Sequence, residues 1–309
     1  MKLDGLQVLR AFAATAVVFF HAASKGSWMK ILDCGIDLFF VLSGFLMTYL
    51  FRPGKPWTGF LRKRALRVLP LYYFAILIAA AEGIYFGESY SGADWLRAVT
   101  LWPTDRPMLI VSWTLSHELL FYAVFSLLYL QRGLGLVALS TWLLSVLAAY
   151  ATGWETFVTS HYNLLFFVGV GLALLVRRAP QAGGVPATLL VAAGVAALFG
   201  VNYFHLFVAQ QDLSVRTLGN GAAAAALLLG IFWLEPHVRY PRWLVALGDA
   251  SYSIYLVHLL PFVVGFKLLA TWPALEAVRV PLLATFGVGA ALACYALVER
   301  PLLRRMRSA

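Results

Sequence analysis

Three ionisable residues inside apolar stretches are the first candidates for chemistry in this sequence. Arg10 and His21 lie in one apolar run near the N-terminus, and Glu118 lies in another, within SWTLSHELLFYAVF. His21 follows Arg10 by eleven residues, which is roughly 16 Å along a helix. If Arg10 stands at one face of a bilayer, His21 lies slightly beyond the middle of a hydrocarbon core about 30 Å thick. An ionisable group at that depth is costly and is a functional candidate by default.

His21 and Glu118 are expected at similar depths, on helices that enter the membrane from opposite faces. A carboxylate that hydrogen-bonds one ring nitrogen orients an imidazole and raises its basicity, so that the other nitrogen can accept a proton. The pair therefore fits a general base with its orienting group. A purely structural pair between two helices is the alternative that the spacing leaves open.

Four basic residues lie together in FLRKRALRVLP: Arg62, Lys63, Arg64 and Arg67. Arg64 and Arg67 are three residues apart and share a helix face, which we place on the turn that leads into the third apolar run. Guanidinium groups grip phosphates through bidentate hydrogen bonds. The cluster therefore fits a phosphate-bearing ligand, although a topology signal or a contact with anionic lipids explains it as well.

Two further stretches place polar residues in apolar surroundings. GIDLFFVLSGFL contains Asp37 at the outer start of its helix, where a carboxylate suits the positive helix end. It also contains Ser43 and Gly44, where helices can approach closely. LGDASYSIYLVH places Tyr252, Tyr255 and His258 on one predicted helix. Capping by Asp37 and an interhelical hydrogen bond from His258 are the structural alternatives. We assign no role to His117, His161, His205 or His237.

These residues belong to a chain with the composition of an integral membrane protein. It has 309 residues, of which 61% are hydrophobic and 12% charged, against about 25% charged in soluble domains. The formal net charge is +10, but the basic residues are spread over short loops, which fits orientation in a membrane better than binding to nucleic acid. Cys34 and Cys294 form no metal or disulfide pattern, so no metal is expected.

Ten apolar runs are expected to form helices, because an open sheet would leave backbone groups unpaired in lipid. They lie near residues 8–26, 35–51, 68–87, 110–130, 134–152, 161–176, 186–205, 217–234, 247–269 and 280–298. All but seven of the 24 lysines and arginines fall on the side of the N-terminus, the exceptions being Lys25, Lys30, Arg97, Arg106, Arg216, Lys267 and Arg279. The positive-inside rule then places both termini in the cytoplasm.

We therefore predict an all-α integral membrane protein, a bundle of about ten transmembrane helices. Residues 1–309 are expected to form a single transmembrane domain with no appended soluble domain. The longest outer loop, near residues 88–109, is placed to cover an outward-facing site. No oligomeric state is predicted.

Taken in order, the motifs resemble the acyltransferase-3 family of bacterial membrane acyltransferases, which modify sugars and polysaccharides. The matching features are Arg10 with His21, GIDLFFVLSGF, RKRALRVLP, WTLSHELLFY, SYSIYLVH and VERPLL, and they cover essentially the whole chain. The opening LQVLRAFAATAVVFFHA and the pattern around Glu118 are most similar to the exopolysaccharide acetyltransferase branch. Gln7 departs from the many relatives that have a basic residue there, and we expect no esterase-like domain of the kind that some members append.

The resemblance implies an enzyme of the bacterial inner membrane, surrounded by membrane lipids. Its donor would be cytoplasmic acyl-CoA, with acetyl-CoA expected, and its acceptor a hydroxyl of an extracytoplasmic polysaccharide or lipid-linked glycan. His21, oriented by Glu118, would act as general base or as a transient acyl carrier. The expected donor-binding residues are Arg10, Arg64, Arg67 and Lys63. The expected substrate-binding or supporting residues are Asp37, Ser43, Tyr122, Tyr252 and His258.

A second interpretation is a proton-coupled secondary transporter or flippase in which His21 and Glu118 relay protons. Transporters often have inverted repeats with broken helices in both halves, and the sequence contains no such pair. A non-enzymatic structural component is less favoured, because ionisable residues inside the membrane would be an unnecessary cost.

Overall fold

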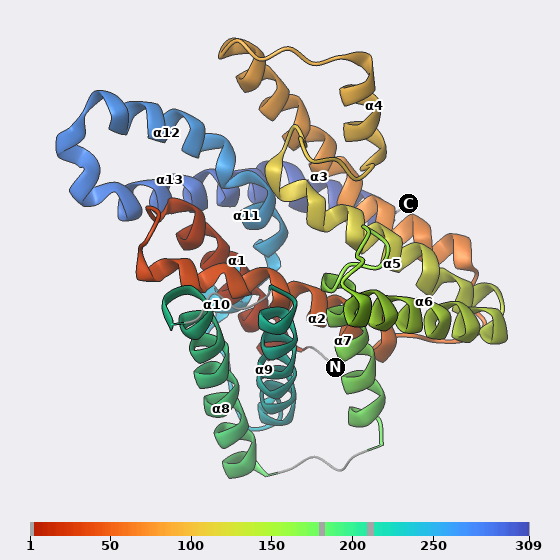
Figure 1. The fold of residues 1–309 in the computed structure, drawn as a ribbon. Coiled ribbons are helices and arrows are strands. Elements are labelled where there is room, and N and C mark those ends of the chain that lie inside the picture. The colour runs from red at the N-terminus through yellow and green to blue at the C-terminus, as the bar shows by residue number, and fades with distance from the viewer. Residues whose placement is uncertain (1–2, 179–182, 209–212, 309) are drawn as a thin grey trace. The chain divides into compact units, whose positions relative to one another are not determined.

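Every regular element of the described chain is a helix. The computed structural model describes residues 3–178, 183–208 and 213–308, and no strand occurs in these ranges (Figure 1). A helix satisfies its own backbone hydrogen bonds, as lipid surroundings require. The all-α prediction is therefore confirmed for the described residues.

The helices follow one another with short connections. In chain order they are α1 (Asp4–Ala22), η1 (Trp28–Asp33), α2 (Cys34–Tyr49), α3 (Trp57–Tyr85), α4 (Gly92–Thr100), η2 (Ile110–Ser112), α5 (Trp113–Leu130), α6 (Arg132–Thr152), α7 (Tyr162–Val176), α8 (Gly184–Tyr203), η3 (Phe204–Val208), α9 (Leu213–Leu234), α10 (Arg242–Asp249), α11 (Ser251–Val257), α12 (Leu259–Thr271), η4 (Pro273–Val278), α13 (Arg279–Cys294), η5 (Tyr295–Glu299) and α14 (Arg300–Ser308). The segments η3 and η5 are π-helical turns.

Eight helical segments in the described ranges are long and apolar enough to cross a membrane. They are α1, η1 with α2, α3, η2 with α5, α6, α8 with η3, α9, and α13 running on into α14. Of the ten predicted runs, the other two are the bent pair α11 and α12, which would make a ninth span, and α7, which has only 15 residues. A bundle of about ten spans with cytoplasmic termini stays a prediction.

The third helix begins earlier than predicted. α3 starts at Trp57 rather than near residue 68, so the sequence RKRALR lies inside the helix and not on a turn leading into it. Leucine, arginine, lysine and alanine are all strong helix formers, so the helix continues through the charged stretch. Apolar content marks the part of a helix that suits lipid and not the residue at which the helix starts.

The prediction of one continuous helix through His258 is wrong. α11 ends at Val257, α12 begins at Leu259, and the two helices are bent by 44°. Pro261 explains the break, because a proline lacks the N–H that would bond to the carbonyl of residue 257 and its ring collides with that carbonyl. Tyr252 and Tyr255 share α11, whereas His258 lies at the bend.

The segment near 88–109, predicted as a loop, contains a helix of its own. Ser91 and Asp94 form a capping box at the start of α4, and the hydrogen bonds from Ser91 lower the pKa of the Asp94 carboxyl. The Tyr72 hydroxyl donates to the carbonyl oxygen of Ala98 at 2.7 Å, and Ser116 Oγ donates to that of Leu101 at 2.8 Å. The segment is therefore anchored to α3 and α5.

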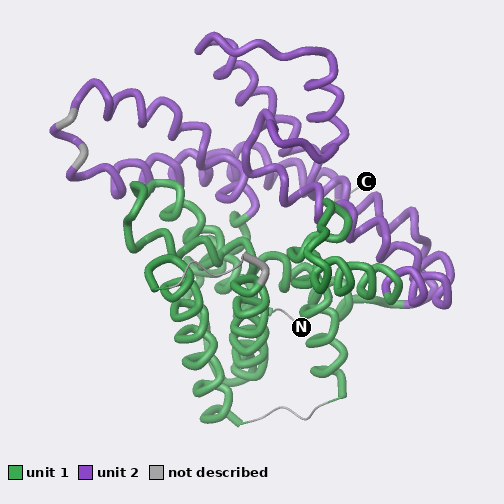
Figure 2. The backbone as a smooth tube through the Cα atoms, in the orientation of Figure 1, with its two compact units in different colours: residues 1–52, 140–251 green, residues 53–139, 252–309 purple. Residues whose placement is uncertain are grey.

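The chain divides into two compact units, each assembled from two segments distant in sequence (Figure 2). Unit 1 contains residues 1–52 and 140–251, and unit 2 contains residues 53–139 and 252–309. The single domain over residues 1–309 stays a prediction.

Small residues let backbones meet inside unit 1. A Cβ atom on Gly44 would lie 2.0 Å from the carbonyl oxygen of Phe166, and one on Gly169 would lie 2.1 Å from that of Val41. Only glycine fits at such a contact, as is common between membrane helices. The predicted close approach beside Ser43 is therefore confirmed: α2 packs directly on α7.

Candidate functional site

His21 occupies the last turn of α1 in unit 1, and its own helix orients the ring. Nδ1 lies 3.0 Å from the carbonyl oxygen of Val17. A carbonyl oxygen only accepts, so Nδ1 carries the proton and the basic lone pair belongs to Nε2. The ring packs edge to face against Phe20, with centroids 5.0 Å apart. The half-buried imidazole is therefore held in the tautomer that a general base needs.

Arg10 lies on the same helix, nearer its start. Its Nε donates to Oγ of Ser251, the fully buried first residue of α11, at 3.1 Å. Close packing of α1 on α10 sets this contact, because a Cβ on Gly248 would lie 2.0 Å from the carbonyl oxygen of Gln7. Gln7, which departs from the family pattern, thus contacts α10 through its backbone.

Glu118 belongs to unit 2 and has a partner on its own helix. Tyr122 stands one turn later on α5, and its hydroxyl donates to Oε1 of Glu118. The guanidinium of Arg64 lies 6.0 Å from the Tyr122 ring centroid and 5.8 Å from that of Phe60. Arg64 is half-buried, and its Nε has no hydrogen-bond partner among the described residues. A buried donor of this kind fits an anionic ligand.

Arg67, the other half of the predicted arginine pair, is already occupied. Its Nη1 lies 2.7 Å from Oε1 of Glu299, whose side chain is 2% exposed. Oε2 of Glu299 accepts from Ser253 Oγ at 2.5 Å, and the Tyr252 hydroxyl donates to the carbonyl oxygen of Val68 at 2.8 Å. Glu299 ends the π-helical turn η5, a geometry that is frequent at functional sites. The sequence pairs Arg64 with Arg67, whereas the structure gives them different environments.

The remaining predicted residues fall into three environments. Lys63 is exposed on α3. Ser43 is half-buried beside Gly44 on α2. His258 is fully buried, with Nδ1 2.9 Å from the carbonyl oxygen of Ile254. His21 and Arg10 belong to unit 1, whereas Glu118, Arg64 and Arg67 belong to unit 2, so the pairing of His21 with Glu118 stays a prediction.

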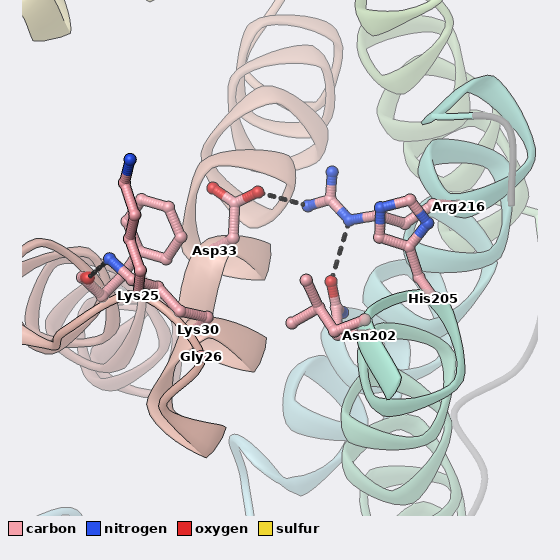
Figure 3. Close-up of a pocket in the computed structure, with 9 residues that line it drawn as sticks. Lys25, Gly26, Lys30, Asp33, Asn202, His205 and Arg216 are labelled. Carbon is pink, nitrogen blue, oxygen red and sulfur yellow. Dashed lines mark hydrogen bonds and ion pairs between the residues drawn. The ribbon is translucent and has the colours of Figure 1, made fainter. Parts of the chain in front are cut away.

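Asp37 does not cap its helix but joins a buried polar network in unit 1. Its Oδ2 accepts from Asn220 Nδ2 at 2.6 Å and from Arg216 Nη2 at 3.3 Å. Arg216 also lies 3.0 Å from Asp33 Oδ2 and donates from Nε to Asn202 Oδ1 at 2.9 Å. Figure 3 shows Asp33 to one side of this guanidinium and Asn202 below it, with the His205 ring beside it.

The sequence pattern does not predict most of this network. It indicates Arg216 only as a charge near the outer side and indicates no role for His205, Asn202 or Asn220. One available signal was the spacing of Arg216 and Asn220, which lie four residues apart on an apolar helix and therefore share a face.

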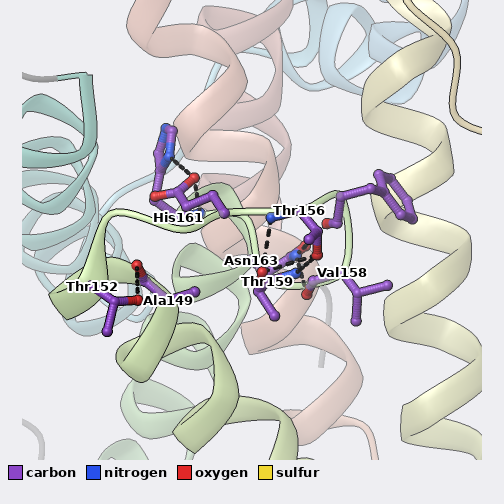
Figure 4. Close-up of polar contacts among 9 residues, drawn as sticks. Ala149, Thr152, Thr156, Val158, Thr159, His161 and Asn163 are labelled. Carbon is purple, nitrogen blue, oxygen red and sulfur yellow. Dashed lines mark hydrogen bonds and ion pairs between the residues drawn. The ribbon is translucent and has the colours of Figure 1, made fainter.

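A second polar cluster without a predicted role lies in the segment that connects α6 to α7. Glu155 Oε2 accepts from Nδ1 of His161 at 2.7 Å, and Thr156 and Thr159 hydrogen-bond each other through side chains and backbone. Asn163 Nδ2 donates to the carbonyl oxygens of Phe157 and Val158. Figure 4 shows these contacts side by side. They fix the start of α7.

Comparison with known proteins places the chain among acyltransferases. Residues 3–299 match the family described as an acyltransferase domain. The exopolysaccharide production protein ExoZ of Rhizobium meliloti (strain 1021) is 32% identical over 314 residues, covering 94% of this chain and 96% of ExoZ. Acyltransferase MdmB of Streptomyces mycarofaciens is 27% identical over 336 residues, covering 87% of this chain and 81% of MdmB.

A further similarity covers only part of the chain. O-acetyltransferase OatA of Staphylococcus aureus (strain NCTC 8325 / PS 47) is 32% identical over 90 residues, which cover 27% of this chain and 15% of OatA. No solved structure matches the chain.

Proposed function

We propose for this chain, which belongs to the acyltransferase-3 family, the transfer of an acyl group from acyl-CoA to a hydroxyl of a polysaccharide or lipid-linked glycan. The family makes the chain an acyltransferase with membrane-spanning helices. The glycan acceptor is supported by a relative named for exopolysaccharide production, and acetyl as the group by one named O-acetyltransferase. The donor, acetyl-CoA, is carried over from the family resemblance.

The observation that carries the chemical proposal is the hydrogen bond from His21 Nδ1 to the Val17 carbonyl oxygen. It supports Nε2 as the atom that accepts a proton. In a one-step transfer the acceptor hydroxyl oxygen attacks the thioester carbonyl carbon while Nε2 takes the hydroxyl proton. The C–S bond then breaks, and the thiolate leaves and takes that proton as free CoA.

In a two-step transfer, Nε2 itself attacks the thioester carbonyl carbon, the C–S bond breaks and CoA leaves as its thiolate. The acceptor hydroxyl oxygen then attacks the acyl carbon, the C–N bond breaks to regenerate His21, and the hydroxyl proton neutralises the thiolate as free CoA. In both versions Glu118 is the carboxylate that we propose to act with His21, and the Tyr122 hydroxyl fixes its rotamer. Ser43 is the proposed donor to the transition-state oxyanion, because the single hydroxyl proton of Tyr122 is already donated to Glu118.

Arg64 is the residue best suited to hold the phosphates of the donor. Its buried Nε has no hydrogen-bond partner among the described residues, and two aromatic rings flank its guanidinium. We propose that Arg67 positions this end of α3 through Glu299, while Lys63 and Arg10 add positive charge for the donor. Tyr252 and His258 would support the site from α11 and its end.

We also propose that one domain of about ten spans lies in the bacterial inner membrane, with both termini in the cytoplasm and lipids around it. The donor then arrives from the cytoplasm and the acceptor from the opposite side. Positive charge on the loops of one side supports this orientation.

Vesicles of defined orientation test both the reaction and the sidedness. Inverted membrane vesicles expose the cytoplasmic face, so added radiolabelled acetyl-CoA should label glycan inside them, whereas right-side-out vesicles should label none. Vesicles containing the His21→Ala protein are the inactive control. Uptake of glycan or sugar driven by a proton gradient, without any acylation, would instead support a transporter.

A further inference from the structure

A cavity of about 330 Å³ opens in unit 1, beside the helix that carries His21 (Figure 3). Its wall is built by Phe20 at the end of α1, by the segment from Lys25 to Asp33, and by residues of α8, η3 and α9. A volume near the lower end of the roughly 300–1,000 Å³ of ligand sites suits one sugar ring better than a long chain.

The floor of this cavity is a buried charged network. Arg216 and Asn202 both line it, and their exposed fractions are only 3% and 1%. Arg216 is held by Asp33 at 3.0 Å, by Asp37 at 3.3 Å and by Asn202 at 2.9 Å. Burying such a group costs desolvation free energy, and the network gives the floor fixed polar atoms. Such atoms can recognise hydroxyl groups by direction as well as by charge.

The rim adds positive charge and an aromatic wall. Lys30 Nζ donates to the carbonyl oxygen of Phe20 at 2.7 Å and lies 4.4 Å from its ring centroid. Lys25 is exposed and makes no hydrogen bond or ion pair with any described residue. Because Arg216 pairs with both nearby carboxylates, the two lysines give the lining an excess of positive charge.

One further polar atom at the cavity is unsatisfied. Nδ1 of His205 is buried and lacks a hydrogen-bond partner within the described ranges. His205 belongs to the π-helical turn η3, and such turns are rare and frequent at functional sites. A ligand hydroxyl in the cavity would supply the missing partner.

The cavity also adjoins the proposed base. Phe20, which lines it, precedes His21 in the chain, and the two rings are in edge-to-face contact with centroids 5.0 Å apart. A ring stacked on Phe20 would therefore bring its hydroxyl groups to the side of unit 1 that carries His21.

We propose that this cavity is the acceptor subsite, that it receives one sugar unit of the glycan, and that Lys25 selects a unit bearing a carboxylate. This inference rests on the proposed function. The aromatic wall contacts the apolar face of the ring, His205 and Arg216 contact its hydroxyl groups, and the lysine rim contacts the carboxylate.

The test uses the full-length protein in nanodiscs with acetyl-CoA and two acceptor probes, a glucuronate-containing hexasaccharide and a neutral glucose hexasaccharide. Lys25→Gln removes the rim charge, and Leu206→Trp fills the cavity from an exposed position on its lining. Lys55→Gln removes another exposed lysine, in unit 2, and is the matched control.

We expect wild-type protein and Lys55→Gln to acylate the uronate probe with a lower KM than the neutral probe. Lys25→Gln should raise the KM for the uronate probe by about three- to fivefold, as for the loss of one exposed ion pair, and thereby reduce the selectivity. Leu206→Trp should raise the KM for both probes by at least about tenfold, while acetyl-CoA binding, measured on the same samples, persists.

Wild-type KM values in Leu206→Trp would overturn the subsite, and a preference of wild type for the neutral probe would overturn the charge selection. Transfer to neither probe by a wild-type protein that binds acetyl-CoA would also overturn the selection. Failure of the proposed function looks different, because wild-type protein would then neither bind acetyl-CoA nor transfer acetyl to any glycan.

Discussion

Two histidines, one in each unit, make almost the same local contacts and yet have different surroundings. Nδ1 of His21 lies 3.0 Å from the carbonyl oxygen four residues earlier, and that of His258 lies 2.9 Å from the equivalent oxygen. Each ring packs edge to face on a phenylalanine, at 5.0 Å for His21 and 5.7 Å for His258. Both therefore have the tautomer with the lone pair on Nε2.

Their surroundings separate them. His258 is fully buried at the bend between α11 and α12. Gly287 of α13 packs against it so closely that a Cβ atom added to this glycine would lie 3.3 Å from the Cβ of His258. His21 is half-buried and adjoins the wall of a cavity through Phe20. Local hydrogen bonding thus prepares a histidine for proton transfer, but access to a ligand decides whether it can be used. We therefore propose a reactive role for His21 and a supporting role for His258.

The largest expected effect is the loss of transfer in His21→Ala. Removing a general base or acyl carrier should reduce kcat by about 10²- to 10⁴-fold, while thermal stability in detergent stays close to that of wild type. Transfer to glycan in inverted vesicles measures the first quantity. His237→Ala, at an exposed histidine with no proposed role, is the control and should transfer normally.

His258→Ala should have the opposite pattern. Truncating a fully buried ring that hydrogen-bonds a carbonyl leaves a cavity, and we expect a loss of stability of about 2–4 kcal/mol. Thermal unfolding in detergent checks this, and activity per folded molecule should change little. A fall in kcat as large as that of His21→Ala, with an unchanged melting temperature, would reverse the assignment.

The two arginines of α3 extend the contrast to a second residue type. Arg64→Gln removes a guanidinium whose buried Nε lacks a hydrogen-bond partner among the described residues. The KM for acetyl-CoA should therefore rise by about tenfold. Arg67→Gln leaves Glu299 without its cation and should lower stability by roughly 1–3 kcal/mol. Donor titrations and melting curves on both variants separate ligand binding from support.

The smallest expected effect is that of Ser253→Ala. This change removes one hydrogen bond to Glu299 but leaves the ion pair with Arg67 in place, so stability should fall by about 1 kcal/mol. If Ser253→Ala lost as much stability as Arg67→Gln, the hydroxyl rather than the cation would be the main partner of Glu299.

The sequence was informative where the interaction is local or the requirement general. Apolar runs located each long helix, because lipid demands about 17–25 apolar residues, and Gly44 correctly marked a close contact of α2 with α7. Pro261 was visible as well, and its effect on the carbonyl four residues earlier predicts the break at His258. Apolar content alone does not reveal the break, because Pro261 lies within the apolar run.

The network around Arg216 could not be read in the same way. Asp37 and Arg216 are 179 positions apart, and no local pattern specifies which distant helix supplies the partner of a buried carboxylate. The contrast between Arg64 and Arg67 was equally hidden, since it depends on Glu299, a residue that approaches α3 only through the fold of unit 2.

The most direct test compares His21→Ala, His258→Ala and wild-type protein in one single-turnover experiment with radiolabelled acetyl-CoA and a glycan acceptor. Donor binding and the folded fraction are measured on the same samples. We predict that His21→Ala binds the donor and transfers no label, while each folded molecule of His258→Ala transfers label at the wild-type rate. Normal transfer by a well-folded His21→Ala protein would contradict it.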